Sequence, residues 1–295
     1  MTGFIGRGTR WLVRRTAGED AVRSFIVNTA ALFNIDLVLT AYRSIGILNY
    51  EDSRVSGEDH LIRDVLPRII RAEKPVFFDV GANRGEMSAA LLESFSTARI
   101  LAFEPNPVTY KALTEALNRF SSGGQAPSLV CIEAGLGAKP GKGVLHCYTS
   151  DQMSGHASMY RDVFRFYEGY GINAASDLTT FEFDIDTIDN VCKTRGIEAI
   201  DFVKIDVEGH ELSVLKGATE MLGRIALIQF EFNEGNVLSR TFMRDFYELL
   251  RDFTFFRLAP DRLIPMGSYA SRHEIFQFQN ILAVRTGSAQ WEALR

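Results

Sequence analysis

Short apolar runs that end in an acidic residue recur in the middle of this chain. Val76–Val80 carries Asp79 near its end, and Ile100–Phe103 leads directly into Glu104. Such continuous apolar runs are typical of strands that are buried on both faces of a parallel sheet. The pattern therefore predicts two parallel strands whose carboxyl ends present the two acids at the same edge of the sheet.

Further strands and helices alternate around these two runs. Strands are predicted at Ser128–Ile132, Ile200–Ile205 and Ala226–Phe232, with an antiparallel edge pair at Phe253–Arg257 and Phe278–Arg285. Helices are predicted at Glu86–Phe95, Val108–Phe120, Leu212–Leu222 and Asp59–Arg71, the last with Pro67 positioned to kink it. This alternation predicts an α/β fold with a doubly wound sheet.

The pattern changes between the third and fourth of these strands. Val144–Tyr148 and Thr179–Ile185 predict two additional strands, whereas Thr149–Leu178 has no regular periodicity. A long irregular connection is typical of a lid or a substrate loop, and a small helical excursion with core aromatics is the alternative. His156 lies in this connection and is a candidate substrate ligand, with a surface histidine as the alternative.

Residues 1–58 are predicted to form a helical appendage to a domain at residues 59–295. Four arginines, Arg7, Arg10, Arg14 and Arg15, precede the apolar segment Phe25–Tyr42, which Asn28, Asn34 and Asp36 interrupt. No uncharged stretch reaches the length of a membrane span. We expect an amphipathic helix that packs on the domain or on a second subunit of a homo-oligomer. Peripheral attachment to a membrane is the less favoured alternative.

Composition narrows the classes of partner and compartment. With 295 residues, of which 46% are hydrophobic, the chain can build a sizeable core. Its net charge of -5 argues against nucleic acid as a partner. Cys131, Cys147 and Cys192 form no Cys-x-x-Cys pair, so we expect a reduced, cytoplasmic compartment and no structural zinc site.

The turn Gly81–Gly85, directly after the first strand, indicates the kind of ligand. Glycine permits positive φ and close approach of the backbone to a ligand, and Glu104 follows at the separation from which an acid reaches a ribose. In the dinucleotide motif Gly-x-Gly-x-x-Gly, however, Asn83 stands at the second glycine position and Glu86 at the third. A carboxylate at that position would repel a pyrophosphate bound at the helix N-terminus. S-adenosylmethionine, which carries adenosine and cationic groups but no phosphate, satisfies both observations.

We therefore expect cofactor contacts from the carboxyl ends of the first four strands. Asp79 is expected near the amino-acid end of the cofactor, and Glu104 on its ribose hydroxyls. The full predicted set is Asp79, Gly81, Ala82, Asn83, Gly85, Glu104, Pro105, Asn106, Ala134, Leu136 and Asp206.

Three blocks, Phe78–Gly85, Phe103–Pro107 and Ile200–Ala218, closely resemble the FkbM family of S-adenosylmethionine-dependent methyltransferases. The resemblance covers about residues 76–285 and leaves the first fifty residues outside. It implies a Rossmann-like methyltransferase fold with seven strands and O-methylation of a sugar or polyketide hydroxyl. The family usually has a small or aromatic residue where His210 stands, and a shorter connection where Thr149–Leu178 lies.

Methyl transfer to oxygen requires a positioned hydroxyl and a group that removes its proton. Asp206, Glu208 and His210 follow the fourth strand and are the catalytic candidates. Alternatively, Asp206 only positions the cofactor and His210 only hydrogen-bonds within its turn. Glu231 and Asn233, at the end of the fifth strand, are candidate substrate ligands, and no metal site is expected.

Lys204 interrupts the apolar fourth strand. Lysine is rarely buried without a partner, so we expect it to pair with a nearby carboxylate.

The expected function is methyl transfer to a hydroxyl of a sugar, glycan or polyketide-type natural product, with no nucleic-acid partner. Two other classes of protein fit the sequence less well. A nicotinamide-dependent oxidoreductase or epimerase is disfavoured by Asn83 and Glu86. A non-catalytic binding module is disfavoured by the acids Asp79, Glu104 and Asp206.

Overall fold

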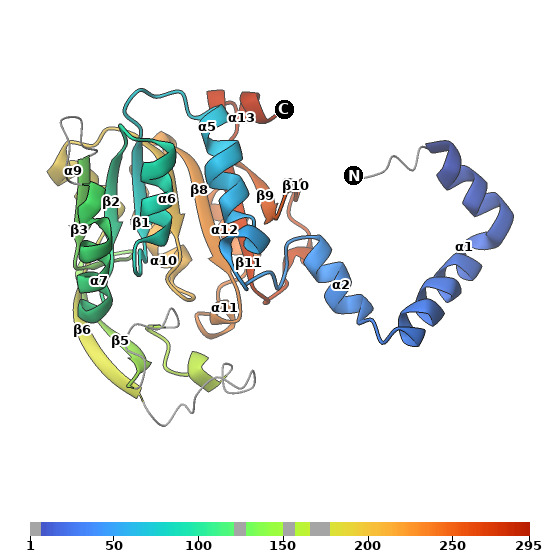
Figure 1. Cartoon of the computed structure of the whole chain (residues 1–295). Helices are drawn as coiled ribbons and strands as arrows, with labels where there is room; N and C mark the ends of the chain where they lie inside the picture. Colours follow the sequence, from blue (N-terminus) through green and yellow to red (C-terminus); the bar gives the residue numbers. More distant parts are fainter. Residues whose placement is uncertain (1–6, 121–127, 150–156, 166–177) are drawn as a thin grey trace. The chain divides into compact units, whose positions relative to one another are not determined.

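The computed structural model in Figure 1 describes residues 7–120, 128–149, 157–165 and 178–295. The chain divides into two compact units, Met1–Ile45 and Gly46–Arg295. The second unit begins upstream of the boundary predicted at residue 58. Ile47 forms a bridge with Gln279, and the backbone N–H of Leu48 donates to the carbonyl of Phe278 at 2.9 Å. These bonds join residues 47 and 48 to Phe278 and Gln279, where the last strand of the sheet begins.

The first unit consists of α1 (Arg7–Leu32) and α2 (Leu37–Ser44). Gly18 breaks α1 with φ 55° and ψ 147°, and the Asp36 carboxylate caps α2 by accepting from the N–H groups of Val38 and Leu39. In the described part of the chain, no single helix has both the length and the apolar character of a membrane span. Gly18–Leu32 and Leu37–Ser44 meet that requirement only as a pair, across a bend of 107°.

The second unit is built on an eight-stranded sheet in the order β10-β9-β11-β8-β7-β1-β2-β3. Its strands are β1 (Val76–Val80), β2 (Arg99–Phe103), β3 (Ser128–Ile132), β7 (Ile200–Ile205), β8 (Ile225–Phe232), β9 (Phe253–Ala259), β10 (Arg262–Pro265) and β11 (Gln279–Arg285). Strands β3-β2-β1-β7-β8 are parallel, and β11 runs antiparallel to both β8 and β9. The predicted Rossmann-like sheet is confirmed, with β10 added as an eighth strand that folds back on β9.

Helices cover both faces of this sheet: α6 and α7 lie together on one face (Figure 1), whereas α10 and α12 pack against the other. The helices of this unit are α3 (Ser53–Ser56), α4 (Glu58–His60), α5 (Leu66–Ile69), α6 (Glu86–Ser94), α7 (Pro107–Leu117), α9 (Ile188–Arg195), α10 (Glu211–Lys216), α11 (Gly235–Leu238), α12 (Met243–Leu249) and α13 (Ala289–Leu294). The single helix predicted at Asp59–Arg71 is instead interrupted by a π-helical segment, Leu61–Val65. Pro67 follows that segment, and because proline lacks an N–H and crowds the preceding turn, the helix widens there.

The two faces of the sheet carry separate parts of the core. Phe77 on β1 and Phe202 on β7 pack with Leu91 of α6, whereas the alternate residues Phe78 and Val203 pack in the cluster that includes α10 and α12. This period of two follows from strand geometry. It leaves the carboxyl ends of the strands as the edge where side chains can meet a ligand.

A second sheet, of order β4-β6-β5, follows β3. It consists of β4 (Gly135–Leu136), β5 (Gly141–Tyr148) and β6 (Leu178–Asp186), and the antiparallel β5–β6 pair confirms the two additional strands. Residues 150–156 and 166–177 of the irregular connection lie outside the described residues, and His156 with them. Within the described part, Phe164 is buried against Tyr148, with ring centroids 4.9 Å apart.

The core packing predicts unequal costs for one substitution at two sites. Phe230 on β8 is fully buried and stacks on Phe246 with ring centroids 4.3 Å apart, whereas Phe242 is 46% exposed. Phe230→Ala should lower the free energy of unfolding by about 3–5 kcal/mol. Phe242→Ala should cost far less. Urea unfolding of both variants checks this, and equal losses would contradict the different burial of the two side chains.

Candidate active site

A cavity of about 540 Å³ lies at the carboxyl ends of β1, β2, β7 and β8. The chain passes from β1 to β2 on one side and later enters β7 on the other, so this is the point where the strand order reverses. Ligands of open α/β sheets bind at such a point. A cavity of this size accommodates a cofactor-sized molecule.

The turn after β1 is held close to the end of β7. Gly81 has φ 79°, and a Cβ atom at this position would lie 1.8 Å from the carbonyl oxygen of Asp206. Gly85, with φ 84°, is required for a different reason: a Cβ there would lie 2.7 Å from Leu113 of α7. Gly81 therefore shapes the cavity wall, whereas Gly85 permits helix packing behind it.

Glu104 is fixed by two backbone donors. Its Oε2 accepts from the N–H of Asn83 at 2.9 Å, and its Oε1 accepts from the N–H of Asn106 at 2.9 Å. Burial raises the pKa of this carboxyl to about 7. Asn106 itself is buried and caps α7 through Oδ1, so it positions Glu104 from behind the cavity.

Lys204 forms an ion pair that joins β1 and β7, which confirms the pairing predicted for it. Its Nζ lies 3.0 Å from Oδ2 of Asp206 and 3.9 Å from Oδ1 of Asp79, and it donates to the carbonyl of Gly81 at 3.4 Å. Burial alone lowers the pKa of Lys204, but the surrounding charges, that of Asp206 first, outweigh it and raise this pKa. Asp79 is fully buried and accepts from the hydroxyl of Ser88 at 2.6 Å.

The turn from Asp206 to His210 has a strained backbone. Glu208 adopts φ 53° without being glycine, and Gly209 follows with φ 98°. The buried Glu211 holds this turn, because its Oε1 accepts from the N–H groups of Val207 at 3.1 Å and Gly209 at 3.0 Å. Strain of this kind persists where the surrounding structure fixes it, commonly at functional sites. Glu211 thus keeps Glu208 at the cavity wall.

His210 lines the cavity and precedes α10. Its Nδ1 lies 3.3 Å from the hydroxyl of Tyr160, and its Nε2 is adjacent to Gly137. Burial lowers the pKa of this imidazole, so the ring is neutral at pH 7.

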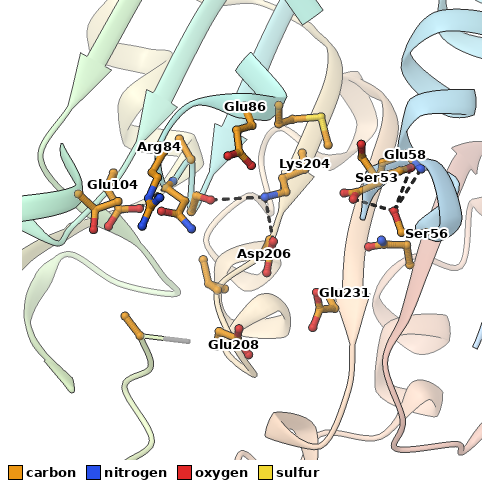
Figure 2. A pocket seen from close by; sticks show the side chains of 18 of the residues that line it. Ser53, Ser56, Glu58, Arg84, Glu86, Glu104, Lys204, Asp206, Glu208 and Glu231 are labelled. Atoms are coloured by element: carbon orange, nitrogen blue, oxygen red, sulfur yellow. Dashed lines mark hydrogen bonds and ion pairs between the residues drawn. The ribbon is translucent and has the colours of Figure 1, made fainter. Parts of the chain in front are cut away.

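A group of carboxyl side chains forms the wall away from Glu104 (Figure 2). Nδ2 of Asn233 donates to Oε1 of Glu231 and, at 3.3 Å, to Oε2 of Glu208. Burial, with the charges of Asp206 and Glu208, raises the pKa of Glu231 well above its usual value. Glu58 of α4 accepts from Nε2 of Gln229 at 2.8 Å and from the hydroxyl of Ser56 at 2.9 Å, and burial raises its pKa as well.

The structure brings most of the predicted site residues together. Those that line the cavity are Gly81, Ala82, Asn83, Glu104, Pro105, Leu136, Asp206, Glu208, His210 and Glu231. Four others, Asp79, Gly85, Asn106 and Asn233, are buried outside the lining, and Ala134 is also outside it. Their predicted direct contacts stay predictions. Within the described ranges, no group of three or more His, Cys, Asp or Glu side chains is arranged to hold a metal ion.

Many residues of the cavity lining were not among the predicted site residues, and Glu58 and Asn280 are two of them. Glu58 lies in a polar stretch before the first strand, where no pattern distinguishes it from a linker residue. Asn280 lies on β11 and lines the same cavity, and the signal that could have found it is the polar pair Gln279 and Asn280 within the predicted strand Phe278–Arg285.

The model of the methyltransferase FkbM domain matches residues 79–256 of this chain. The hexuronic acid methyltransferase AglP of Haloferax volcanii is 27% identical over 237 residues, which cover 78% of this chain and 82% of that protein. The methyltransferase sdnD of Sordaria araneosa is 30% identical over 50% of this chain and 61% of its own length. The 2-O-methyltransferase NoeI of Sinorhizobium fredii is 22% identical over 56% of this chain and 66% of its own.

Among solved structures, a methyltransferase FkbM from Methylobacillus flagellatus aligns with a TM-score of 0.45 and 15% identity. The alignment covers 83% of this chain and 58% of that one. This chain therefore spans less than two thirds of the length of that structure and of sdnD.

Removing the central lysine should destabilise the fold in a pH-dependent way. Lys204→Met leaves Asp79 buried without its cation, which should lower the free energy of unfolding by about 3 kcal/mol at about pH 8. The deficit should shrink toward about pH 5, because Asp79 then binds a proton in the folded variant, which stabilises the folded state as the pH falls.

Urea unfolding across this pH range measures the effect. The matched control is Lys142→Met on β5, whose ion pair with Asp184 is exposed and should contribute little at any pH. A deficit for Lys204→Met that does not depend on pH would contradict the account of Asp79.

Proposed function

Since this chain belongs to the FkbM methyltransferase family, we propose that it methylates a hydroxyl of a sugar or natural product. The chain is an S-adenosylmethionine-dependent methyltransferase. The observation that carries the finer proposal is a single cavity with two chemically different ends. Glu104 and the Gly81 turn form one end, and the carboxyls of Asp206, Glu208 and Glu231 form the other. The names of two relatives, a hexuronic acid methyltransferase and a 2-O-methyltransferase, support it.

The residues at the first end fit the cofactor. Glu104 lines the cavity and presents a carboxylate whose remaining lone pairs can accept from the two ribose hydroxyls. Oδ1 of Asn83 is buried and has no hydrogen-bond partner among the described residues, so it offers an acceptor to a ligand donor. Pro105 and Leu136 add apolar surface. When bound, S-adenosylmethionine supplies an electrophilic methyl group on a sulfonium.

The residues at the second end fit a hydroxyl acceptor. Asp206 is paired with Lys204, which holds it as a charged hydrogen-bond acceptor that orients a hydroxyl. We assign removal of the hydroxyl proton to Glu208, because Asn233 and the strained turn fix its carboxylate at the cavity wall. His210 is neutral, but its ring nitrogens face Tyr160 and Gly137, so we expect a smaller contribution from it.

Cofactor affinity should depend on the protonation of Glu104. As the pH falls through about 7, this carboxyl gains a proton and loses acceptor capacity, so binding of S-adenosylmethionine should weaken between about pH 8 and pH 6. Glu104→Gln should weaken binding by about tenfold or more and remove the pH dependence.

Calorimetry with S-adenosylmethionine measures both effects. Glu115→Gln, at an exposed position of α7, is the control and should bind as the wild type does. A pH dependence that persists in Glu104→Gln would contradict the ribose contact. Absence of binding at millimolar cofactor would overturn the cofactor site itself.

The catalytic assignment predicts an order of effects. Glu208→Gln should lower kcat by about 10²–10⁴-fold, because a general base contributes on that scale, whereas His210→Ala should lower it much less. Asp206→Asn should raise KM as well as lower kcat, since it loses a positioning contact. Methylation assays of the three variants, with exposed Glu182→Gln on β6 as control, test this order. If each variant retained wild-type turnover, the assignment would be wrong.

A further inference from the structure

We propose that the acceptor end of the cavity selects its substrate by charge. It takes a polyhydroxylated acceptor that is uncharged, or that carries an amino group, close to the methylated hydroxyl, and it rejects sugar acids. This inference rests on the proposed function and names the class of acceptor for the same site.

Four carboxyl side chains surround the acceptor end: Glu58, Asp206, Glu208 and Glu231 (Figure 2). They come from distant parts of the chain, and Glu58 lies outside the residues 79–256 that match the family model. They are close enough to influence one another, since the charge of Asp206 acts on both Glu58 and Glu231. The carboxyl groups of this wall therefore interact with one another electrostatically.

Neutral amides hold three of these carboxyls. Gln229 donates to Glu58 at 2.8 Å, and Asn233 donates to both Glu208 and Glu231. Amide donors fix the direction of a carboxylate without cancelling its charge. The lone pairs that remain suit donors on a ligand, namely hydroxyl or ammonium groups.

Among the described residues, Lys204 is the charged basic side chain next to this end of the cavity, and it offsets part of the negative charge of Asp206 and Glu58. Among the described residues that line the cavity, Arg84 and Lys204 are the basic ones. Lys204 is 7% exposed and already lies between Asp206 and Asp79. Figure 2 shows Arg84 on the side of Glu104, well separated from Glu58 and Glu231. By sequence, residues 121–127, 150–156 and 166–177 contain no lysine or arginine that could add a cation.

A ligand carboxylate would therefore meet carboxyls whose neighbouring cation, Lys204, is already paired with Asp206 and Asp79. At a separation of about 6 Å and an effective dielectric constant of about 20, one like-charge contact corresponds to on the order of 100-fold in an equilibrium constant. An ammonium group at the same place would be attracted by the carboxyls, so its binding would be strengthened. This distinguishes the chain from its Haloferax relative, whose name gives hexuronic acid as its acceptor.

The test uses methyl glycosides that differ only at carbon 6. The glucoside, the 6-amino-6-deoxyglucoside and the glucuronoside present a hydroxymethyl group, an ammonium group and a carboxylate, and the galactose and mannose series repeat the comparison. Formation of S-adenosylhomocysteine and product mass give kcat/KM for each. The neutral and amino sugars should exceed the uronic acid by on the order of 100-fold in at least one series.

Two isosteric variants locate the discrimination. At a pH high enough to ionise both carboxyls, Glu58→Gln and Glu231→Gln should each raise kcat/KM for the uronic acid relative to the neutral sugar by about tenfold or more, because each then removes one like charge. Glu198→Gln, at an exposed position remote from the lining, should leave the ratio unchanged. Thermal melting confirms that each variant is folded.

The outcomes separate the two proposals. Preference for the uronic acid, or an unchanged ratio in both folded variants, overturns the charge selection and leaves the proposed function in place. Absence of product from every series, with S-adenosylmethionine still bound in calorimetry, overturns the sugar-directed function and the charge selection with it.

Discussion

The contact of Lys204 with Asp206 and Asp79 is the constraint on which the site depends. A lysine that is 7% exposed requires opposite charges close by, and here they come from the ends of two neighbouring strands. The same ammonium donates to the carbonyl of Gly81, so the turn after β1 is drawn against β7. Only glycine tolerates that approach, because any Cβ would strike the Asp206 carbonyl. The buried charge of Lys204 thus accounts for the placement of the two aspartates, for the need for glycine at position 81 and for the shape of this part of the cavity wall.

The cavity concentrates carboxyl groups at a cost in stability that its function explains. Burial raises the pKa values of Glu58, Glu104 and Glu231, which means that the folded structure disfavours the charged form of each carboxyl. Backbone N–H groups and amide side chains offset part of this cost. Such clusters persist where a ligand supplies the missing positive charge or hydrogen-bond donors. A sulfonium cofactor and a hydroxyl acceptor supply both.

Much of the fold was predictable because its signals are local. Buried parallel strands appear as continuous apolar runs, so β1, β2, β7 and β8 were predicted close to their observed bounds. The edge strand β10 was missed, since four partly exposed residues ending in proline carry no such run. The helix before β1 is interrupted because the turn preceding Pro67 widens to avoid a clash with the proline ring. Hydrophobic periodicity alone does not predict such a change in helix geometry.

The sequence predicted which residues belong to the site better than it predicted what each of them does. Asn106 and Gly85 stand in the right motifs, and the structure shows a capping bond for Asn106 and a helix contact for Gly85, while their contacts with the cofactor stay predictions. The cofactor end is built from short motifs, where sequence neighbours are also spatial neighbours. The acceptor end joins Glu58, Glu231 and Asn280, which only the folded sheet brings together. A motif can therefore identify the methyl donor, while the acceptor depends on long-range packing that lies partly outside the family segment.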